Sequence, residues 1–355
     1  MQNPRAATVS QLSDFDEIID VRSPAEYAED HIPGAISAPV LDDAQRAEVG
    51  TLYVQVSPFV AKRRGAALIA RNIATHLETL FKDKPKQWKP LVYCWRGGQR
   101  SGAMAHILAQ VGWSTCKIEG GYKNYRRQVL ADLETLPDNL QFRVVGGPTG
   151  SGKSRLLHAL EDQGAQVLDL EALAQHRGSL LGNLPGEPQP AQKMFESRIW
   201  DVLRRCDPQR PIFVEAESKK IGLLSMPATL LQKIRNSECL LIEAPVAARV
   251  QLLMEDYEHF LSDPALLIRR LTPLLPLHGR QVLDHWQQLV ERGEWTALVE
   301  KLLLEHYDPA YLRSTTNNFL RLNDAVVLKL DRLDEDALRA AAARIATPTN
   351  RPNQA

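Results

Sequence analysis

Cysteine is scarce in this sequence of 355 residues. Its four cysteines lie far apart, and no two of them form a Cys-x-x-Cys pair: Cys94, Cys116, Cys206 and Cys239. This spacing argues against a structural zinc site and against a disulfide framework. It is typical of a protein from a reducing compartment.

Long apolar runs are also missing. No run approaches the roughly 20 residues that a membrane-spanning helix needs. The first 17 residues lack a basic start followed by an apolar core, so no signal peptide is visible. We find no internal repeat. These absences predict a cytoplasmic protein that has no membrane partner.

Net charge is absent as well, because 43 basic residues balance 43 acidic ones. The balance is uneven along the chain: it is −7 over residues 1–50 and +11 over residues 51–130. A basic block suits a polyanion such as RNA, or a small phosphorylated donor. The lysines between residues 82 and 89 are better explained as the solvated surface of a loop.

What is present describes a globular protein, with 44% apolar and 24% charged residues. The length suggests two or three domains. Short apolar strands at Glu17–Arg22, Leu91–Cys94 and Thr115–Glu119 alternate with helical patterns over residues 60–80 and 101–111. This alternation predicts an α/β domain with a parallel sheet, whose ligands bind at the carboxyl ends of the strands.

One such strand ends at Cys94 and is followed by a turn rich in glycine and arginine. Backbone N–H groups of this loop and of the helix after it would face an anion. Two arginines would favour the thiolate, the form that attacks. We therefore predict a nucleophilic Cys94 in an anion cradle made of Trp95, Arg96, Gly97, Gly98 and Arg100. A buried structural cysteine is the simpler alternative.

The first 135 residues resemble the rhodanese family. The resemblance rests on three motifs in order: Asp20-Val-Arg-Ser-Pro-x-Glu-Tyr27, His31-Ile-Pro-Gly-Ala-Ile36 and the loop that begins at Cys94. It implies a rhodanese-like fold in which the loop cysteine carries a persulfide-type intermediate. Trp95 and the long Arg-Gly-Gly-Gln-Arg segment differ from the simple thiosulfate sulfurtransferases.

A second α/β unit follows a linker at Pro137–Asn139. The apolar strand Phe142–Gly146 leads into Gly147-Pro-Thr-Gly-Ser-Gly-Lys-Ser154, which matches the phosphate-binding loop (P-loop) pattern G-x-x-x-x-G-K-[ST]. Lys153 would reach the terminal phosphates and Ser154 a Mg²⁺ ion. The predicted phosphate-binding residues are Gly147, Thr149, Gly150, Gly152, Lys153 and Ser154.

Further strands are expected at Gln166–Glu171, Ile212–Ser218 and Cys239–Pro245. Glu215 and Glu217 would share one strand face and could position a metal, or they could simply face solvent. A glycine-containing loop after the second strand could contact an anion or be a surface turn. The residues that we predict to support the P-loop are Asp169, His176, Arg177, Glu215 and Glu217.

From residue 246 the pattern turns helical, with a turn and an aromatic pair at Tyr307–Tyr311. The histidines of this region are not at metal-ligand spacing. We predict a rhodanese-like domain over residues 1–136, a P-loop NTPase-like α/β domain over 137–245, a mainly helical region over 246–346 and a disordered tail over 347–355.

The combination of both motifs resembles the tRNA 2-selenouridine synthase family. The resemblance runs from about residue 10 to residue 345 and includes Glu119-Gly-Gly-Tyr-Lys123, His176-Arg-Gly-Ser179 and Val214-Glu-Ala-Glu-Ser218. It implies a transferase that exchanges the sulfur of wobble 2-thiouridine for selenium in tRNAs for Lys, Glu and Gln. The selenium-carrying cysteine of the family corresponds to Cys94.

The resemblance also implies the substrates. Selenophosphate would donate selenium, and geranyl diphosphate would alkylate the sulfur to make it a better leaving group. No tightly bound cofactor is implied, although Mg²⁺ and a protein that supplies selenophosphate fit the chemistry. Beside Trp95, the candidate contacts to the tRNA anticodon region are Tyr122, Lys123, Arg126 and Arg127.

Two other functions stay open from the residues alone. One is an ATP-dependent sulfurtransferase that acts on RNA or a small molecule through a Cys94 persulfide. The other is a non-enzymatic binding protein in which the P-loop is a nucleotide switch. The loop cysteine disfavours the second, because inactive rhodanese-like modules usually lack it.

Overall fold

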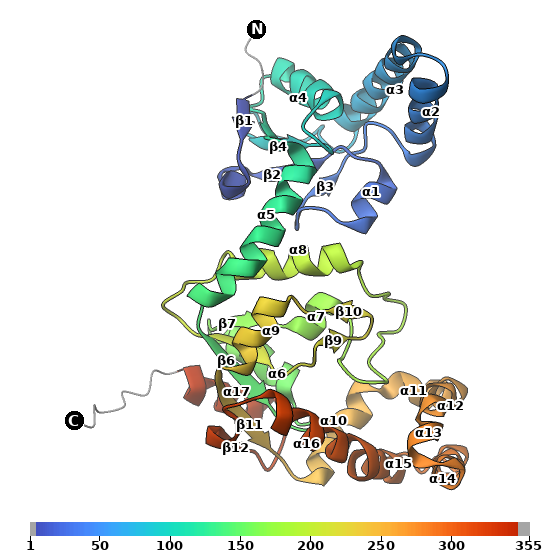
Figure 1. Cartoon of the computed structure of the whole chain (residues 1–355), viewed down its shortest axis with the longest axis vertical. Helices are drawn as coiled ribbons and strands as arrows, with labels where there is room; N and C mark the ends of the chain where they lie inside the picture. The colour runs from blue at the N-terminus through green and yellow to red at the C-terminus, as the bar shows by residue number, and fades with distance from the viewer. Residues whose placement is uncertain (1–4, 347–355) are drawn as a thin grey trace, which may run out of the picture. The chain divides into compact units, whose positions relative to one another are not determined.

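The computed structural model describes residues 5–346, so the predicted tail lies outside the described residues. The chain forms two compact units (Figure 1). Unit 1 comprises the described residues up to Asp132 together with Ala191–Asp201, and unit 2 comprises Leu133–Pro190 and the residues from Val202 onward. The assignment of Ala191–Asp201 to unit 1 has no signal in the linear sequence.

Unit 1 contains a parallel five-stranded sheet in the order β1-β5-β4-β2-β3. Its strands are β1 (Arg5–Ala7), β2 (Glu17–Asp20), β3 (Ile36–Ser37), β4 (Pro90–Tyr93) and β5 (Cys116–Ile118). All four residues of β4 are buried, as expected for a strand at the centre of a parallel sheet. The predicted parallel sheet is confirmed.

Unit 1 also contains the following helices, the last two of which end in unit 2. They are α1 (Pro24–Glu29), α2 (Asp43–Gln55), α3 (Pro58–Glu78), α4 (Gln99–Val111), α5 (Gly121–Thr135) and α8 (Gln192–Leu203). Helix α1 begins as the sequence predicts, with Ser23 and Glu26 in a capping box and Pro24 in the first turn. Helices α2 and α3 pack side by side (Figure 1).

Unit 2 contains a second parallel five-stranded sheet, in the order β12-β11-β6-β8-β7. Its strands are β6 (Phe142–Gly146), β7 (Gln166–Leu168), β8 (Ile212–Glu215), β11 (Glu238–Glu243) and β12 (Val326–Lys329), and β9 (Lys220–Ile221) and β10 (Leu224–Ser225) form a small antiparallel pair. The carboxyl ends of β6, β7 and β8 carry the P-loop and the predicted acidic residues.

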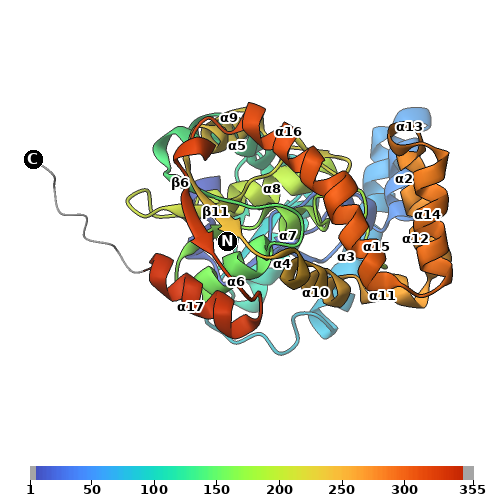
Figure 2. The same ribbon diagram turned by 90° about the horizontal axis from the view of Figure 1, so that it is seen from below.

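The helices of unit 2 fall into two groups. Around the sheet lie α6 (Lys153–Asp162), α7 (Leu170–Ala174), α9 (Ala228–Arg235), α10 (Val246–Asp256) and α17 (Glu335–Ala346). The others are α11 (Glu258–Ser262), α12 (Pro264–Leu271), α13 (Leu275–His278), α14 (Arg280–Glu291), α15 (Trp295–Lys301) and α16 (Asp308–Asn318). Several of this second group enclose a separate apolar core around Trp286 (Figure 2).

Three local predictions in unit 2 are wrong. Strand β7 ends before Asp169, and Glu171 belongs to α7. Strand β8 ends at Glu215, so Glu217 does not share a strand face with it. Tyr307–Tyr311 is not a turn, because the π-helix Leu302–Tyr307 runs directly into α16. The C-terminal region also contributes β12, which pairs with β11, and α17, which packs on α6.

Within residues 5–346, no helix is both long enough and apolar enough to cross a membrane.

Candidate functional site

Cys94 lies immediately after β4 and is 3% exposed. Its Sγ is 3.2 Å from the hydroxyl Oγ of Ser101, a fully buried residue in the first turn of α4. Sequence reasoning did not single out Ser101, although it closes the same loop. A hydroxyl in this position can donate a hydrogen bond to the sulfur.

The Cys94 loop is held in place by the start of α5. The N–H of Tyr122 donates to the carbonyl of Cys94 (2.9 Å), and the N–H of Lys123 donates to the carbonyl of Trp95 (3.0 Å). Gly121 allows this approach: its φ is +60°, and a Cβ there would lie 2.2 Å from the Cys94 carbonyl oxygen. The Glu119–Lys123 segment is therefore the clamp of this loop.

Anion-binding groups converge at this loop. The amide N–H groups of residues 95–101 find no acceptor within the part of the chain that the structure describes. The last three of them belong to the first turn of α4, where N–H groups are left free to bind an anion. Arg96 is exposed, whereas Arg100 donates to Glu26 at 2.6 Å. The charge of Arg100 is therefore already balanced, which sequence reasoning did not foresee.

Two stacked aromatic rings flank the loop. Trp95 is 39% exposed, and its ring centroid lies 5.2 Å from that of Tyr122 at an interplanar angle of 29°. Tyr122 itself is buried, donates its hydroxyl proton to Asp30 (2.7 Å) and carries the Arg22 guanidinium over its ring at 4.0 Å. Tyr122 thus supports Trp95, and Trp95 is the ring that a splayed base can reach.

The basic residues of α5 differ in their surroundings. Lys123 and Arg127 are exposed. Arg126 is partly buried, pairs with Glu196 of α8 within the same unit and donates to the carbonyl of Lys193 (3.1 Å). The exposed pair can meet a phosphate, whereas Arg126 has a structural partner already.

In unit 2 the P-loop connects β6 to α6 as predicted. Lys153 folds back over the loop, and its Nζ donates to the carbonyl of Gly147 at 2.9 Å. The Ser154 hydroxyl donates to Oε2 of Glu171 at 3.2 Å. Both side chains therefore lie at the mouth of the loop, where the sequence pattern places phosphate and metal.

Distant residues brace the P-loop, and sequence reasoning missed them. Arg249 of α10 is 3% exposed and donates from Nε (2.9 Å) and Nη2 (2.8 Å) to the Thr149 carbonyl. Asp308 accepts two further bonds from the same guanidinium, at 2.6 and 3.0 Å. The hydroxyl of Tyr311 accepts from the Gly147 N–H at 2.8 Å. No sequence signal links these positions to the loop.

Three glutamates lie beside the loop. Burial and the neighbouring Glu217 raise the pKa of Glu171 to about 8, against the opposing pull of Lys153. Burial also raises the pKa of Glu217, and burial together with the nearby carboxylates raises that of Glu215 well above its usual range. Glu215 accepts from the Leu170 N–H (3.2 Å), while its Oε1 is buried without a partner.

The other residues that we predict to support the P-loop line the cleft beside it. Asp169 caps α7 by accepting from the Ala172 N–H (2.7 Å) and bonds His158 (2.9 Å). His176 is buried, and its Nδ1 accepts from the Gly178 N–H (3.1 Å). Gly178 lies against the acids, because a Cβ there would come within 2.5 Å of Oε1 of Glu171. Arg177 lies over the Tyr257 ring at 4.9 Å.

These residues line one cleft of about 680 Å³ in unit 2. Its wall includes the P-loop, Glu171, Glu217 and the loop of residues 176–179. A smaller pocket of about 60 Å³ adjoins it, shares Thr149, Ser179, Leu253, Tyr257 and Tyr307 with it and is otherwise lined by apolar residues. The arrangement can hold a phosphorylated ligand whose other end is apolar.

The residues fit a Mg²⁺ ion of the kind that phosphates bring with them. Magnesium takes oxygen ligands, and it commonly keeps waters and substrate phosphates with only one or two protein groups. The Ser154 hydroxyl and the Glu171 carboxylate supply such oxygens together. Within residues 5–346, no three His, Cys, Asp or Glu side chains form a self-sufficient metal site.

Comparison with known proteins decides the family. A rhodanese-like domain model matches residues 5–128, and a model described as the tRNA 2-selenouridine synthase AAA domain matches residues 140–265. A tRNA 2-selenouridine synthase of Nitrosomonas europaea is 34% identical over 80% of this chain and 76% of its own length. The chain belongs to the tRNA 2-selenouridine synthase family.

Other members agree over still longer spans. The tRNA 2-selenouridine synthase of Aeromonas salmonicida is 30% identical over 86% of this chain and 89% of its own length. That of Cupriavidus necator is 32% identical over 83% of this chain and 87% of its own. The predictions of an enzyme and of a rhodanese-like domain followed by a P-loop domain are confirmed.

Proposed function

We propose that this enzyme converts wobble 2-thiouridine to 2-selenouridine in tRNAs for Lys, Glu and Gln. Selenophosphate supplies the selenium, and the sulfur is first alkylated by geranyl diphosphate. One observation carries the proposal: a single chain has a sulfur nucleophile in an amide cradle and a P-loop cleft with an apolar neighbour. The names of the relatives supply the tRNA and the selenium.

The P-loop cleft takes geranyl diphosphate in this proposal. The loop amides and Lys153 hold the diphosphate and stabilise it as it leaves, which is electrostatic catalysis of a departing anion. Mg²⁺ at Ser154 and Glu171 neutralises further charge when bound. The apolar pocket beside Leu253 and Tyr257 receives the first part of the hydrocarbon chain, which an ATP-binding role does not explain.

The Cys94 loop takes selenophosphate. The free N–H groups at the start of α4 bind its phosphate, and the sulfur lies at the floor of the same loop beside Ser101. Cys94 then acts as the nucleophile: its thiolate attacks phosphorus, an S–P bond forms as the P–Se bond breaks, and selenium leaves as selenide with the bonding electron pair. Selenophosphate reaches this loop from solution or from a supplying protein.

The RNA is recognised in the same unit. Trp95 offers an exposed ring for a base that is turned out of its stack, and Lys123 and Arg127 offer exposed charges for phosphates. The contribution of Arg126 and Tyr122 is to hold this surface in place. The anticodon loop, with its unpaired bases, is the part of tRNA that such a surface fits.

A double dissociation tests the proposal. Purified full-length enzyme is given 2-thiouridine tRNA with geranyl diphosphate, or pre-geranylated tRNA with selenophosphate, and the nucleosides are resolved by mass spectrometry. Lys153→Ala should lower geranylation by about 10²–10³-fold and leave selenation of the pre-geranylated tRNA intact. Cys94→Ser should do the reverse.

The controls separate the other functions. If the wild-type enzyme needs ATP and inserts sulfur, the sulfurtransferase alternative is correct. If Cys94→Ser retains selenation, the role of the cysteine fails although the family assignment stands. Arg339→Met, which removes exposed ion pairs with Glu335 and Asp336 on α17, should behave as wild type in both assays.

A further inference from the structure

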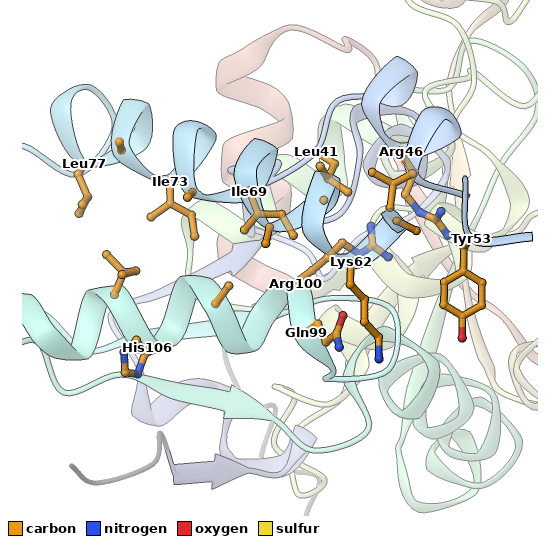
Figure 3. A pocket seen from close by; sticks show the side chains of 18 residues that line it. Leu41, Arg46, Tyr53, Lys62, Ile69, Ile73, Leu77, Gln99, Arg100 and His106 are labelled. Carbon is orange, nitrogen blue, oxygen red and sulfur yellow. The ribbon is translucent and has the colours of Figure 1, made fainter. Parts of the chain in front are cut away.

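Unit 1 contains a groove that the proposed reaction does not yet use. It has a volume of about 690 Å³ and runs between α3 and α4, with α2 at one end (Figure 3). Ile69, Ile73 and Leu77 of α3 point into it. The helix face between them bears only alanines, and Ala66, Ala70 and Ala74 are all exposed. A folded core would fill such a space with larger side chains, so the groove is open to a ligand.

The groove lies against the apolar cluster that contains Cys94, which itself does not line the groove. Ile73, together with the partly buried Ile69, Leu77 and Ala103, packs in the same apolar cluster as Cys94. Gln99 and Arg100 line the mouth of the groove and directly precede Ser101, whose hydroxyl is 3.2 Å from the sulfur. A chain that occupies the groove is therefore packed against the helix whose first turn lies beside the sulfur.

The charges at the rim select the kind of ligand. The lining includes three cations, Arg46, Lys62 and Arg100, and no carboxylate. Only Arg100 has an acidic partner within the described residues, Glu26. An apolar floor below unpaired cations complements a hydrocarbon chain attached to a polyanion.

We propose that this groove binds the geranyl chain of the S-geranylated tRNA nucleotide during selenium transfer, while the rim cations contact the RNA phosphates. This inference rests on the proposed function. In the step that it serves, C2 of the base gains a bond to selenium and loses its bond to sulfur. The sulfur leaves with the bonding electron pair as geranyl thiolate. The selenium comes from selenophosphate: the Cys94 thiolate attacks phosphorus, the P–Se bond breaks with its electron pair on selenium, and this selenide attacks C2. Water then cleaves the S–P bond and gives phosphate.

A chain held in the groove orients C2 toward Cys94, and the apolar surroundings then keep the departing thiol. The contact also favours selenation of tRNA that has already been geranylated. A nucleotide that has been geranylated binds unit 1 better than one that has not, so the modified tRNA proceeds to selenation. The apolar pocket in unit 2 binds the geranyl donor, and the groove in unit 1 binds the geranylated product of that first step.

The test compares two tryptophan variants on α3. Ala70→Trp fills the groove, whereas Ala67→Trp places the same side chain at an exposed position that does not line it. Binding of two anticodon stem-loop RNAs, one with 2-thiouridine and one with its S-geranyl form, is measured by fluorescence anisotropy with the full-length protein. A second groove variant, Ala66→Phe, guards against a folding defect in the first.

Wild type and Ala67→Trp should bind the geranylated RNA about tenfold more tightly than the 2-thiouridine RNA, because part of the hydrocarbon surface is buried. Ala70→Trp and Ala66→Phe should lose this preference and keep their affinity for the 2-thiouridine RNA. Equal preference in all four proteins would overturn the inference. A change of oligomeric state in the groove variants, with the preference retained, would assign the groove to a second copy instead.

The proposed function has a separate readout. If the wild type fails to make 2-selenouridine from geranylated RNA and selenophosphate, the function fails whatever the binding data show. If it succeeds while the groove variants match Ala67→Trp in both binding and single-turnover rate, only the groove assignment fails.

Discussion

The Cys94 loop and the P-loop have similar local structures but are held in place differently. Each follows a buried parallel strand, contains at least two glycines and leads into a helix whose first amides are suited to bind an anion. They differ in what holds them. The Cys94 loop is fixed by backbone bonds from residues 122 and 123, about thirty positions away in the chain. The P-loop is fixed by Arg249 and Tyr311, 100 and 164 residues from their partners.

This difference predicts which structural changes would disrupt each site. A loop held by neighbouring backbone depends on glycine and on local geometry. A loop held by a buried guanidinium and a distant hydroxyl depends on the whole unit having folded. Local unfolding of the C-terminal helices should therefore disable the P-loop and leave the Cys94 loop intact.

The largest expected effect comes from breaking one ion pair at each loop. Asp308→Asn leaves the Arg249 guanidinium, 4% exposed, without its counter-charge and should destabilise unit 2 by about 3–5 kcal/mol. Glu26→Gln at the more exposed Arg100 pair should cost unit 1 only about 1 kcal/mol. Urea-dependent hydrogen exchange, read separately on β6 and β4, measures both. Equal losses would contradict the comparison.

The next effect is a pH dependence confined to the P-loop cleft. Glu171 has a pKa of about 8 in the folded chain, against an ordinary value of 4.5, so the folded state holds this proton more tightly than the unfolded state. The resulting stabilisation is complete below about pH 4.5 and is lost as the pH rises through 8. In Glu171→Gln, the free energy of unfolding of unit 2 should change across this pH window by about 1–3 kcal/mol less than in the wild type.

The control for this experiment is Glu187→Gln, which changes an exposed carboxylate in the same unit and should leave the slope unchanged. Thermal melts of the ligand-free protein between pH 5 and pH 8.5 suffice. If Glu171→Gln leaves the slope of stability against pH unchanged, the interaction of Glu171 with Glu217 does not contribute to the pH dependence.

The smallest effect is the loss of one hydroxyl. Tyr311→Phe removes the acceptor of the Gly147 N–H and should cost about 1 kcal/mol in unit 2. Because the loop is then held less firmly, the KM for geranyl diphosphate should rise by a few fold, whereas selenation of pre-geranylated tRNA should not change. Thr296→Val, which removes an exposed hydroxyl on α15 of the same unit, is the matched control. A defect in selenation by Tyr311→Phe would show that the two loops are coupled.

Much of the architecture could be predicted from local patterns. The strand before Cys94, the capping box of α1 and the P-loop are short segments whose residues determine their own conformation. Strand β12 could not be predicted this way. It is short, largely exposed and pairs only at the edge of the sheet, within a stretch whose pattern is mainly helical.

The sites show the same division. Cys94, Lys153 and Ser154 have the residue types and spacing that their chemistry needs, and the chain determines their loops directly. Arg249, Asp308 and Tyr311 carry no such signal, because an arginine, an aspartate or a tyrosine on a helix faces its partner only through packing. Folding also places partners beside charges that the sequence shows as free, because Arg100 forms an ion pair with Glu26.

The sequence by itself thus determined two strand–loop–helix sites and the family, since these follow from backbone preferences and contiguous motifs. Only the tertiary structure decided which side chains neutralise Arg100 and brace the P-loop, that burial raises the pKa of three neighbouring glutamates, and that an open apolar groove lies against the cluster containing Cys94. The physical reason is that burial, charge pairing and cavity shape depend on residues that are far apart in the chain and meet only after folding.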